Sequence, residues 1–346
     1  MSLLIMSLAV NCYFLRNELY DLAFGIYQFL STSKAMETEL VKITPLRVGT
    51  DCSGIEAPIQ ALLQSNIPFH HVWSCEVDKY AIQTCKANYP EPIVRYSDIN
   101  TRDHSTLPDI DLYVCGFPCQ SFSGAGKRLG LEDAKGTIMF QCIEVIKVKQ
   151  PKYFILENVR GFMGDKKGAT MQLLLDSLNE LGYTVHHKLL NTKDFGLPQN
   201  RPRVYFVGIR NDLKQSFSFP SAPMKSVSLD SVLTSREYDH NYKQNAKSVD
   251  KHILNYYQKH GNNPGDNLVI APCNFGNAMN GVSPTLTTSC GYYMTKYNRR
   301  LSPIECMKLQ GFPEDFKQVV SNTQFYKQAG NSMSVPILKC LISQLY

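Results

Sequence analysis

Residues 47–76 read RVGTDCSGIEAPIQALLQSNIPFHHVWSCE. The run at 47–52 predicts a β-strand, a glycine turn follows it, 58–64 predicts a helix, and the aromatic and β-branched run at 71–76 predicts a second strand. Two strands joined through a helix form a βαβ unit, in which the strands run parallel. The stretch therefore predicts an α/β fold with a mostly parallel sheet.

The same alternation continues along the chain to Arg210. Further strands are expected at 93–96, 111–115, 153–156, 184–190 and 204–209, and further helices at 79–88, 137–147 and 170–181. Residues 211–298 are rich in Ser, Asn, Lys and Tyr and lack this periodicity, which predicts a second, smaller and irregular lobe. Helical patterns at 303–309 and 335–345 indicate that the chain then returns to the first lobe. We therefore expect a first domain at 46–210, a second at 211–298, and a segment at 299–346 that completes the first.

The N-terminal segment has no residue that points to chemistry. Residues 1–15 are largely apolar but lack the basic start of a signal peptide. Arg16 ends the run before it is long enough to cross a bilayer. We expect residues 1–35 to be a dispensable appendage and no membrane anchor, with Met36 an equally suitable start.

Charge and cysteine content limit the kinds of partner, metal site and cellular compartment that the protein can have. The chain has 36 Lys and Arg against 30 Asp and Glu, and its net charge of +6 is compatible with a polyanionic partner without identifying one. Its 11 cysteines include no Cys-x-x-Cys pair, which fits neither a disulfide framework nor a zinc ribbon. We expect no disulfide, no metal, and a reducing compartment inside the cell: cytoplasm, nucleoid or nucleus.

Polar residues follow the first three predicted strands, where open α/β sheets bind their ligands. Ser53 and Gly54 form a turn in which backbone amides can approach a cofactor. Glu76 follows Gly54 by 22 residues, the spacing at which a carboxylate takes the ribose hydroxyls of an adenosine cofactor. Asp98 can accept from the adenine amino group. Any one acid could be a loop residue or helix cap, but their common register favours a cofactor site.

Residues 116–124, GFPCQSFSG, follow the fourth predicted strand. A cysteine is most often a small buried residue. Cys119, however, stands between Pro118 and a Ser- and Gly-rich loop, where a thiol is accessible and amides can lower its pKa. This stretch resembles the Pro-Cys motif of the cytosine-C5 DNA methyltransferases, in which the cysteine is the nucleophile.

Other stretches resemble the remaining motifs of that family, in the family's order. They are ENV at 157–159, QNRPR at 199–203, RLSPIEC at 300–306, LQGFP at 309–313 and GNSMSVP at 330–336. Singly, these could be a structural carboxylate, a basic surface or a helix cap. Their joint order makes the resemblance specific, and it covers the chain from about Arg47 to the C-terminus.

The resemblance implies a Rossmann-like, S-adenosylmethionine-dependent methyltransferase fold and a catalytic group. Cys119 would attack C6 of a cytosine rotated out of the helix, and Glu157 would assist at N3. Arg203 would contact O2, Arg201 would orient Glu157 or hold a phosphate, and Asn158 would fix the active-site loop.

The resemblance also implies binding residues. Those for S-adenosyl-L-methionine are Cys52, Ser53, Gly54, Glu76, Val77, Asp98, Ile99, Pro118, Asn331 and Ser332, and those for the nucleotide are Gln120, Ser121 and Thr285. The first motif departs from the common pattern, with Cys52 at an aromatic position and Glu56 at a glycine one. Its wording, Cys-Ser-Gly-Ile-Glu-Ala, is similar to a variant in phage-like members.

The implied partner is double-stranded DNA, methylated by a monomer without an obligate protein partner, as in a restriction-modification system. Residues 211–298 would be the target-recognition domain, since residues 221–300 carry nine Lys or Arg against five acids. A tRNA methyltransferase is the nearest alternative, but the Cys-Phe-Thr tripeptide of that branch is absent. A non-catalytic relic would lose Cys119, Glu157 or Arg203, and a nicotinamide dehydrogenase would leave the Pro-Cys-Gln stretch unexplained.

Overall fold

The computed structural model describes residues 44–118, 138–220, 227–233, 246–261, 268–271, 278–288 and 291–346. The chain divides into two units, Met1–Thr44 and Pro45–Tyr346, and every element given below belongs to the second. The appendage expected at 1–35 lies outside the described residues, as do Cys119, Gln120 and Ser121.

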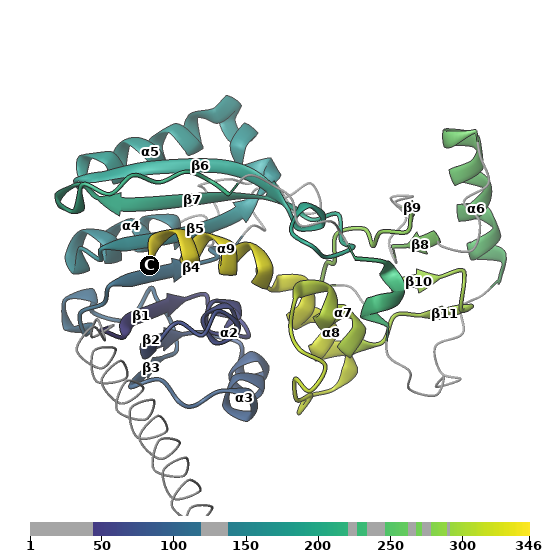
Figure 1. Cartoon of the computed structure of the whole chain (residues 1–346), viewed down its shortest axis with the longest axis horizontal. Helices are drawn as coiled ribbons and strands as arrows, with labels where there is room; N and C mark the ends of the chain where they lie inside the picture. Colours follow the sequence, from purple (N-terminus) through teal and green to yellow (C-terminus); the bar gives the residue numbers. More distant parts are fainter. Residues whose placement is uncertain are drawn as a thin grey trace, which may run out of the picture. The chain divides into compact units, whose positions relative to one another are not determined.

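A seven-stranded sheet in the order β3-β2-β1-β4-β5-β7-β6 forms the centre of the second unit (Figure 1). Its strands are β1 (Leu46–Asp51), β2 (Phe69–Cys75), β3 (Val94–Tyr96), β4 (Leu112–Cys115), β5 (Tyr153–Val159), β6 (Tyr183–Asn191) and β7 (Pro202–Arg210). The first five pair in parallel, whereas β7 runs antiparallel to both β5 and β6. The prediction of a mostly parallel sheet is confirmed.

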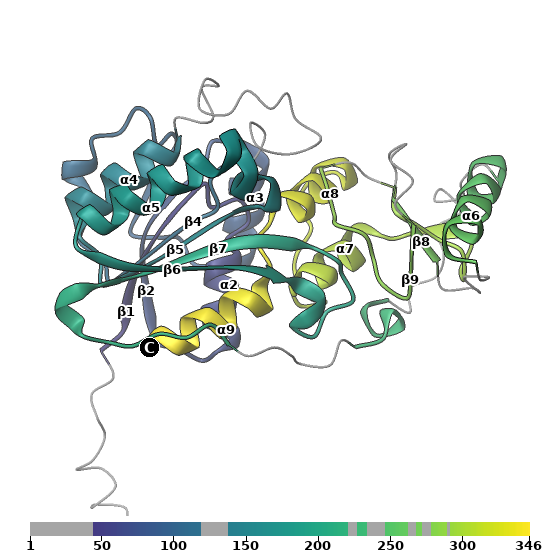
Figure 2. The ribbon, with the colours of Figure 1, turned by 90° about the horizontal axis from the view of Figure 1, so that it is seen from above.

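Helices cover both faces of this sheet, which explains why its strands read as nearly continuous apolar runs. In β4, Leu112 and Val114 belong to one core cluster, and Tyr113 and Cys115 to the other. The first cluster includes residues of α2 (Ala57–Gln64), α3 (Lys79–Asn88) and α9 (Val335–Leu345), and the second includes residues of α4 (Ile138–Lys149) and α5 (Ala169–Glu180). Figure 2 shows α2 and α9 on one side of the sheet and α4 and α5 on the other.

The C-terminal segment adds α7 (Pro303–Gln310) and α8 (Asn322–Asn331) before α9. A capping box starts α7, in which Ser302 and Glu305 satisfy each other's backbone N–H groups. The helix α9 packs against α2, and the Thr84 hydroxyl in α3 donates to Gln328 Oε1 in α8 at 3.0 Å. The end of the chain thus packs on the helices that follow the first strands.

The segment between β7 and α7 is more regular than its sequence predicts. It contains a second sheet in the order β11-β10-β8-β9 and the 15-residue helix α6 (Ala246–His260). The strands are β8 (Leu268–Ile270), β9 (Ala278–Asn280), β10 (Tyr293–Met294) and β11 (Arg299–Arg300). Ile253 and Tyr256 of α6 pack against this sheet. These residues thus have regular secondary structure where the sequence predicted an irregular lobe.

Short 3-10 helices complete the secondary structure: η1 (His104–Thr106), η3 (Arg160–Gly168), η4 (Thr192–Asp194), η5 (Asn211–Leu213) and η6 (Leu229–Val232). Among the described helices, none combines the length and the hydropathy that crossing a membrane requires.

Candidate active site

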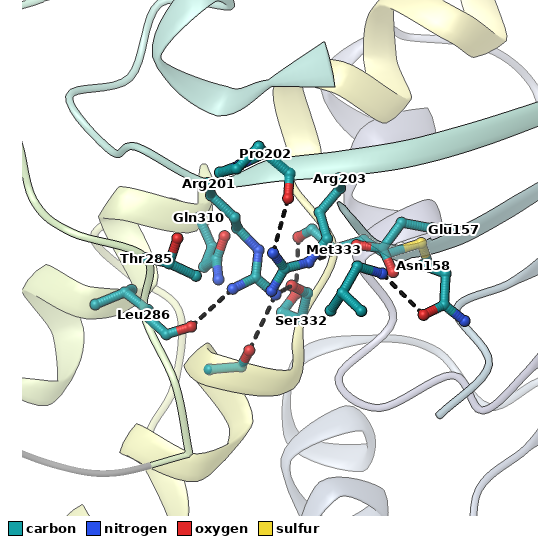
Figure 3. A network of polar contacts seen from close by, with 12 residues as sticks. Glu157, Asn158, Arg201, Pro202, Arg203, Thr285, Leu286, Gln310, Ser332 and Met333 are labelled. Atoms are coloured by element: carbon teal, nitrogen blue, oxygen red, sulfur yellow. Dashed lines mark hydrogen bonds and ion pairs between the residues drawn. The ribbon is translucent and has the colours of Figure 1, made fainter. Parts of the chain in front are cut away.

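An acidic and a basic side chain meet where β5 ends and β7 begins. Arg203 Nε lies 3.3 Å from Glu157 Oε1, and Glu157 is 8% exposed (Figure 3). Burial raises the pKa of the Glu157 carboxyl, while the positive charges of Arg203 and Arg201 act in the opposite direction. A carboxyl group that keeps its proton to higher pH than usual is suited to donate it to a bound base.

Asn158 points to the other face of β5, where it holds the chain just before the predicted nucleophile. Its Nδ2 donates to the carbonyl oxygen of Phe117 at 3.3 Å. The Phe117 ring is buried and packs edge-on against Phe162, with 5.5 Å between ring centroids. This geometry agrees with the predicted role of Asn158 in fixing the loop that starts at Pro118.

Arg201 binds backbone oxygens from two distant segments. Its guanidinium donates to the carbonyl of Leu286 at 2.8 Å, of Gly330 at 3.0 Å and of Ser332 at 2.7 Å (Figure 3). The residue is 2% exposed, so its side chain is not accessible to a phosphate. We expected Arg201 to hold a phosphate or to orient Glu157. Its burial disagrees with phosphate binding. Its effect on Glu157 is electrostatic, because its positive charge lowers the pKa of that carboxyl.

Two glutamines that the sequence interpretation left without a role belong to the same network. Gln199 is fully buried, donates to the Leu309 carbonyl at 2.7 Å and accepts from the Leu286 N–H at 3.2 Å. Gln310, also fully buried, donates to the Ala329 carbonyl at 2.5 Å. Gln199 stands in the QNRPR stretch and Gln310 in the LQGFP stretch, so their place inside these motifs was the available signal.

The segment before β10 and the end of α8 are in close backbone contact, where Thr287 lies against Gly330. A Cβ at that position would lie 2.0 Å from the Thr287 carbonyl oxygen, which only a glycine avoids. Close to this contact, the Thr285 hydroxyl donates to the Asn200 carbonyl at 2.6 Å. Thr285, predicted to lie near the nucleotide, is thus also held by the protein.

The turn after β1 and the end of β2 form the predicted cofactor corner. Glu76 accepts the Gly54 N–H at 2.7 Å and the Asp78 N–H at 2.8 Å, one on each carboxylate oxygen. Burial raises the pKa of Glu76, and these hydrogen bonds oppose the shift. Each oxygen keeps a further lone pair for a ribose hydroxyl. Val77 beside it is 72% exposed, an apolar surface on which an adenine ring can pack. These residues fit an adenosine cofactor.

The other predicted cofactor residues differ in accessibility. Asp98 Oδ1 accepts two bonds from Asn100, while Ile99 is 3% exposed and packs in the core, which leaves its backbone for a ligand. Cys52 and Pro118 are half-buried, and Ser53 is 5% exposed. Asn331 is exposed at the end of α8, and the hydroxyl of the buried Ser332 donates to the Met333 carbonyl at 3.0 Å.

A buried ion pair beneath this corner was also missed. Asp51 accepts from both terminal nitrogens of Arg102 and from the Tyr113 hydroxyl, the latter at 2.8 Å. The guanidinium also lies over the Trp73 ring at 4.8 Å. The pair fixes the loop after β3, which carries Asp98, to the end of β1.

Comparisons with known proteins show to which family the chain is similar. The family model described as C-5 cytosine-specific DNA methylase matches residues 52–346. Type II methyltransferase M1.ScrFI of Lactococcus lactis subsp. cremoris is 38% identical over 290 residues, which cover 79% of this chain and 71% of the relative. Type II methyltransferase M.NgoBI of Neisseria gonorrhoeae is 39% identical over 276 residues, 78% of this chain and 84% of the relative.

A solved structure shows the same fold. The crystal structure of the S. pombe Dnmt2 methyltransferase has a TM-score of 0.64 at 19% identity and covers 87% of this chain and 98% of its own. Because the family model spans most of the chain and the relatives exceed 30% identity, the assignment does not depend on the fold alone. The chain belongs to the C-5 cytosine-specific DNA methylase family and is a DNA cytosine-C5 methyltransferase that uses S-adenosylmethionine as methyl donor.

Proposed function

We propose that this protein methylates cytosine within one specific DNA sequence, as the modification enzyme of a type II restriction-modification system, through a covalent bond between Cys119 and C6. The observation that carries the mechanism is the buried Glu157 beside Arg203 at the edge of the sheet. The relatives named type II methyltransferases support the system.

The chemistry requires a carbanion equivalent at C5. The Cys119 thiolate adds to C6, the C5–C6 double bond breaks, and negative charge develops at O2 and N3. The protonated Glu157 donates to N3, and Arg203 stabilises the charge at O2. S-adenosylmethionine, when bound, supplies an electrophilic methyl group to C5. Water then removes the C5 proton, the electron pair re-forms the C5–C6 double bond, Cys119 leaves as the thiolate, and N3 returns its proton to Glu157.

We assign the cofactor to the corner formed by the ends of β1, β2 and β3. Glu76 would accept the ribose hydroxyls, Val77 would cover the adenine ring, and Asp98 would accept from its amino group. Cys52, Ser53, Gly54, Pro118, Asn331 and Ser332, with the backbone of Ile99, would form the walls. The spacing of Glu76 from Gly54 and the exposure of Val77 support this assignment.

We assign DNA recognition to residues 211–298, with Gln120, Ser121 and Thr285 near the flipped nucleotide. Lys251 and Lys259 are exposed on α6 and are suited to phosphate contact. Rotating the cytosine out of the duplex costs a few kcal/mol, which contacts to both strands would offset.

The test is a covalent trap. A duplex with 5-fluorocytosine at the target site, mixed with protein and S-adenosylmethionine, should give an adduct on a denaturing gel, because fluorine cannot leave as a proton does. Cys119→Ser should form no adduct and transfer no methyl group, yet bind cofactor like the wild type; Cys340→Ser, a half-buried thiol in α9, is the matched control. Turnover by Cys119→Ser would refute the mechanism.

Bisulfite sequencing of DNA from expressing cells identifies the target, and methylation without a common flanking sequence would refute site specificity.

A further inference from the structure

The turn between β1 and α2 has an unusual backbone. Cys52, Gly54 and Glu56 all adopt left-handed conformations, with φ of 47°, 53° and 59°. Side chains with a Cβ rarely adopt this conformation, so at Cys52 and Glu56 the surrounding contacts must hold it. The turn presents Ser53 and Gly54 to the assigned cofactor corner, so whatever holds its shape also affects that corner.

Glu56 makes contacts of the required kind. Its carboxylate is 1% exposed, and Oε1 accepts the Thr50 hydroxyl at 3.0 Å and the Ser74 hydroxyl at 2.6 Å. Although Glu56 directly precedes α2, its side chain does not cap that helix. The carboxylate instead links the turn to β1 through Thr50 and to β2 through Ser74.

The same contacts continue to the residues assigned to the cofactor. Ser74 Oγ lies 3.2 Å from Ser53 Oγ, and the Ser53 N–H donates to the Cys75 carbonyl at 3.2 Å. One residue further, the Gly54 N–H donates to Glu76. The turn is therefore fixed to β2 along its length, and the carboxylate of Glu56 is the buried charged group in this set of bonds.

We propose that Glu56 is a positioning residue of the S-adenosylmethionine site: through Thr50 and Ser74 it holds the turn in the shape in which Ser53 and Gly54 meet the cofactor. The inference rests on the proposed cofactor site. The common pattern of the family has a glycine at this position, which adopts a left-handed φ without strain. Here a glutamate adopts that φ, and its hydrogen bonds to β1 and β2 hold it there.

Two substitutions separate the hydrogen bonds from the backbone conformation. Glu56→Gln keeps Oε1, which accepts both bonds. It removes the negative charge of the carboxylate, whose Oε1 lies 3.7 Å from His71 Nε2, and puts an amide nitrogen in place of Oε2, which has no hydrogen-bond partner within the described part of the chain. Glu56→Gly permits the left-handed φ but removes the carboxylate. The matched control is Lys214→Gly, which introduces glycine at an exposed position with φ of 50°, away from the site.

Calorimetry and steady-state kinetics give the readouts. Glu56→Gly should raise the dissociation constant and the KM for S-adenosylmethionine about tenfold, equivalent to about 1.4 kcal/mol. The kcat at saturating cofactor and the affinity for DNA should stay at wild-type values. Glu56→Gln should restore cofactor affinity to within about twofold of wild type, and Lys214→Gly should leave it unchanged. A purely structural role would not separate cofactor affinity from DNA affinity in this way.

A wild-type cofactor affinity for Glu56→Gly would overturn the inference. Glu76→Ala, measured alongside, separates this result from failure of the proposed cofactor site. Weaker cofactor binding by Glu76→Ala alone refutes only the role of Glu56. Unchanged cofactor binding by both variants shows that the cofactor binds elsewhere. Should Glu56→Gly fail to fold, Thr50→Val decides, because it keeps the side-chain shape and removes one hydroxyl donor. It should weaken cofactor binding about threefold, and an unchanged affinity overturns the inference.

Discussion

Replacing Arg201 with methionine tests whether this arginine is structural. Methionine has a similar length but no donor, so Arg201→Met removes the hydrogen bonds to the carbonyls of Leu286, Gly330 and Ser332. These carbonyls come from segments 85 to 131 residues away in sequence. The substitution therefore removes the link that Arg201 makes between Leu286 and the end of α8, while the direct contact of Gly330 with Thr287 remains.

The expected loss of stability follows from burial. An unsatisfied buried polar group costs roughly 1–3 kcal/mol, and at the low end of that range the loss of the donor to three carbonyls amounts to about 3 kcal/mol. Because Arg201 is 2% exposed, solvent does not screen these bonds. The midpoint of thermal unfolding should fall by roughly 6–12 °C, at about 2–4 °C for each kcal/mol.

Urea unfolding and the salt dependence of DNA binding measure the two roles separately. Arg201→Met should lower the urea midpoint of unfolding. It should leave unchanged the slope of the logarithm of the DNA association constant against the logarithm of the salt concentration, whereas loss of one phosphate contact reduces the magnitude of that slope by about 0.9. The matched control is Arg210→Met at the end of β7. Its guanidinium pairs with the exposed Asp212 and donates to the Gln150 carbonyl, and because the ion pair is partly exposed its loss should cost about 1 kcal/mol or less. Wild-type stability together with a reduced salt slope would refute the structural role of Arg201.

Three further outcomes follow from the site. Burial raises the pKa of Glu157, and its protonated form donates to N3, so kcat should fall as the pH rises through that pKa. Arg203→Met removes a positive charge that lowers this pKa, so it should move the fall in kcat to higher pH. A fall in kcat at the wild-type pH would contradict the role of Glu157. Glu76→Ala should weaken S-adenosylmethionine binding by roughly 1–3 kcal/mol in calorimetry, and an unchanged affinity would place the adenosine elsewhere. Lys166→Gly and Lys167→Gly, at left-handed positions, should each raise the free energy of unfolding by about 0.5 kcal/mol in urea titrations, and a loss would show that their side chains stabilise the fold.

The first domain could be predicted from sequence because its strands are apolar runs buried on both faces. The helices at 79–88 and 335–345 were predicted with the bounds that the structure has. The helix α8 was missed because few of its residues are apolar, and it buries the polar Gln328 beside Phe325 and Tyr326. In α6, Ile253 and Tyr256 contact a sheet of two- and three-residue strands, too short to leave a pattern in sequence.

The site was predicted in part, for a similar reason. Residues such as Glu76 and Asp98 follow strands, and the ends of parallel strands share one edge of a sheet, so their proximity follows from order along the chain. Arg201 binds backbone carbonyls, which every residue has, and no side-chain type in the partner segments indicates the contact. The sequence therefore indicates which strand ends meet but not which groups hold them in place.

The direction of β7 explains how Glu157 and Arg203 come together. Glu157 stands near the end of β5, whereas Arg203 stands at the start of β7. In a fully parallel sheet, the start of one strand and the end of its neighbour lie at opposite edges. Because β7 is antiparallel, Val159 pairs with Arg203 and Glu157 with Tyr205, so both side chains lie at the edge that carries the cofactor corner. Residues at the start of one strand can meet residues at the ends of the parallel strands only if the first strand runs in the opposite direction. The reversal of β7 is thus a requirement of the proposed catalytic site, and the position of the QNRPR stretch at the start of its strand already implies it.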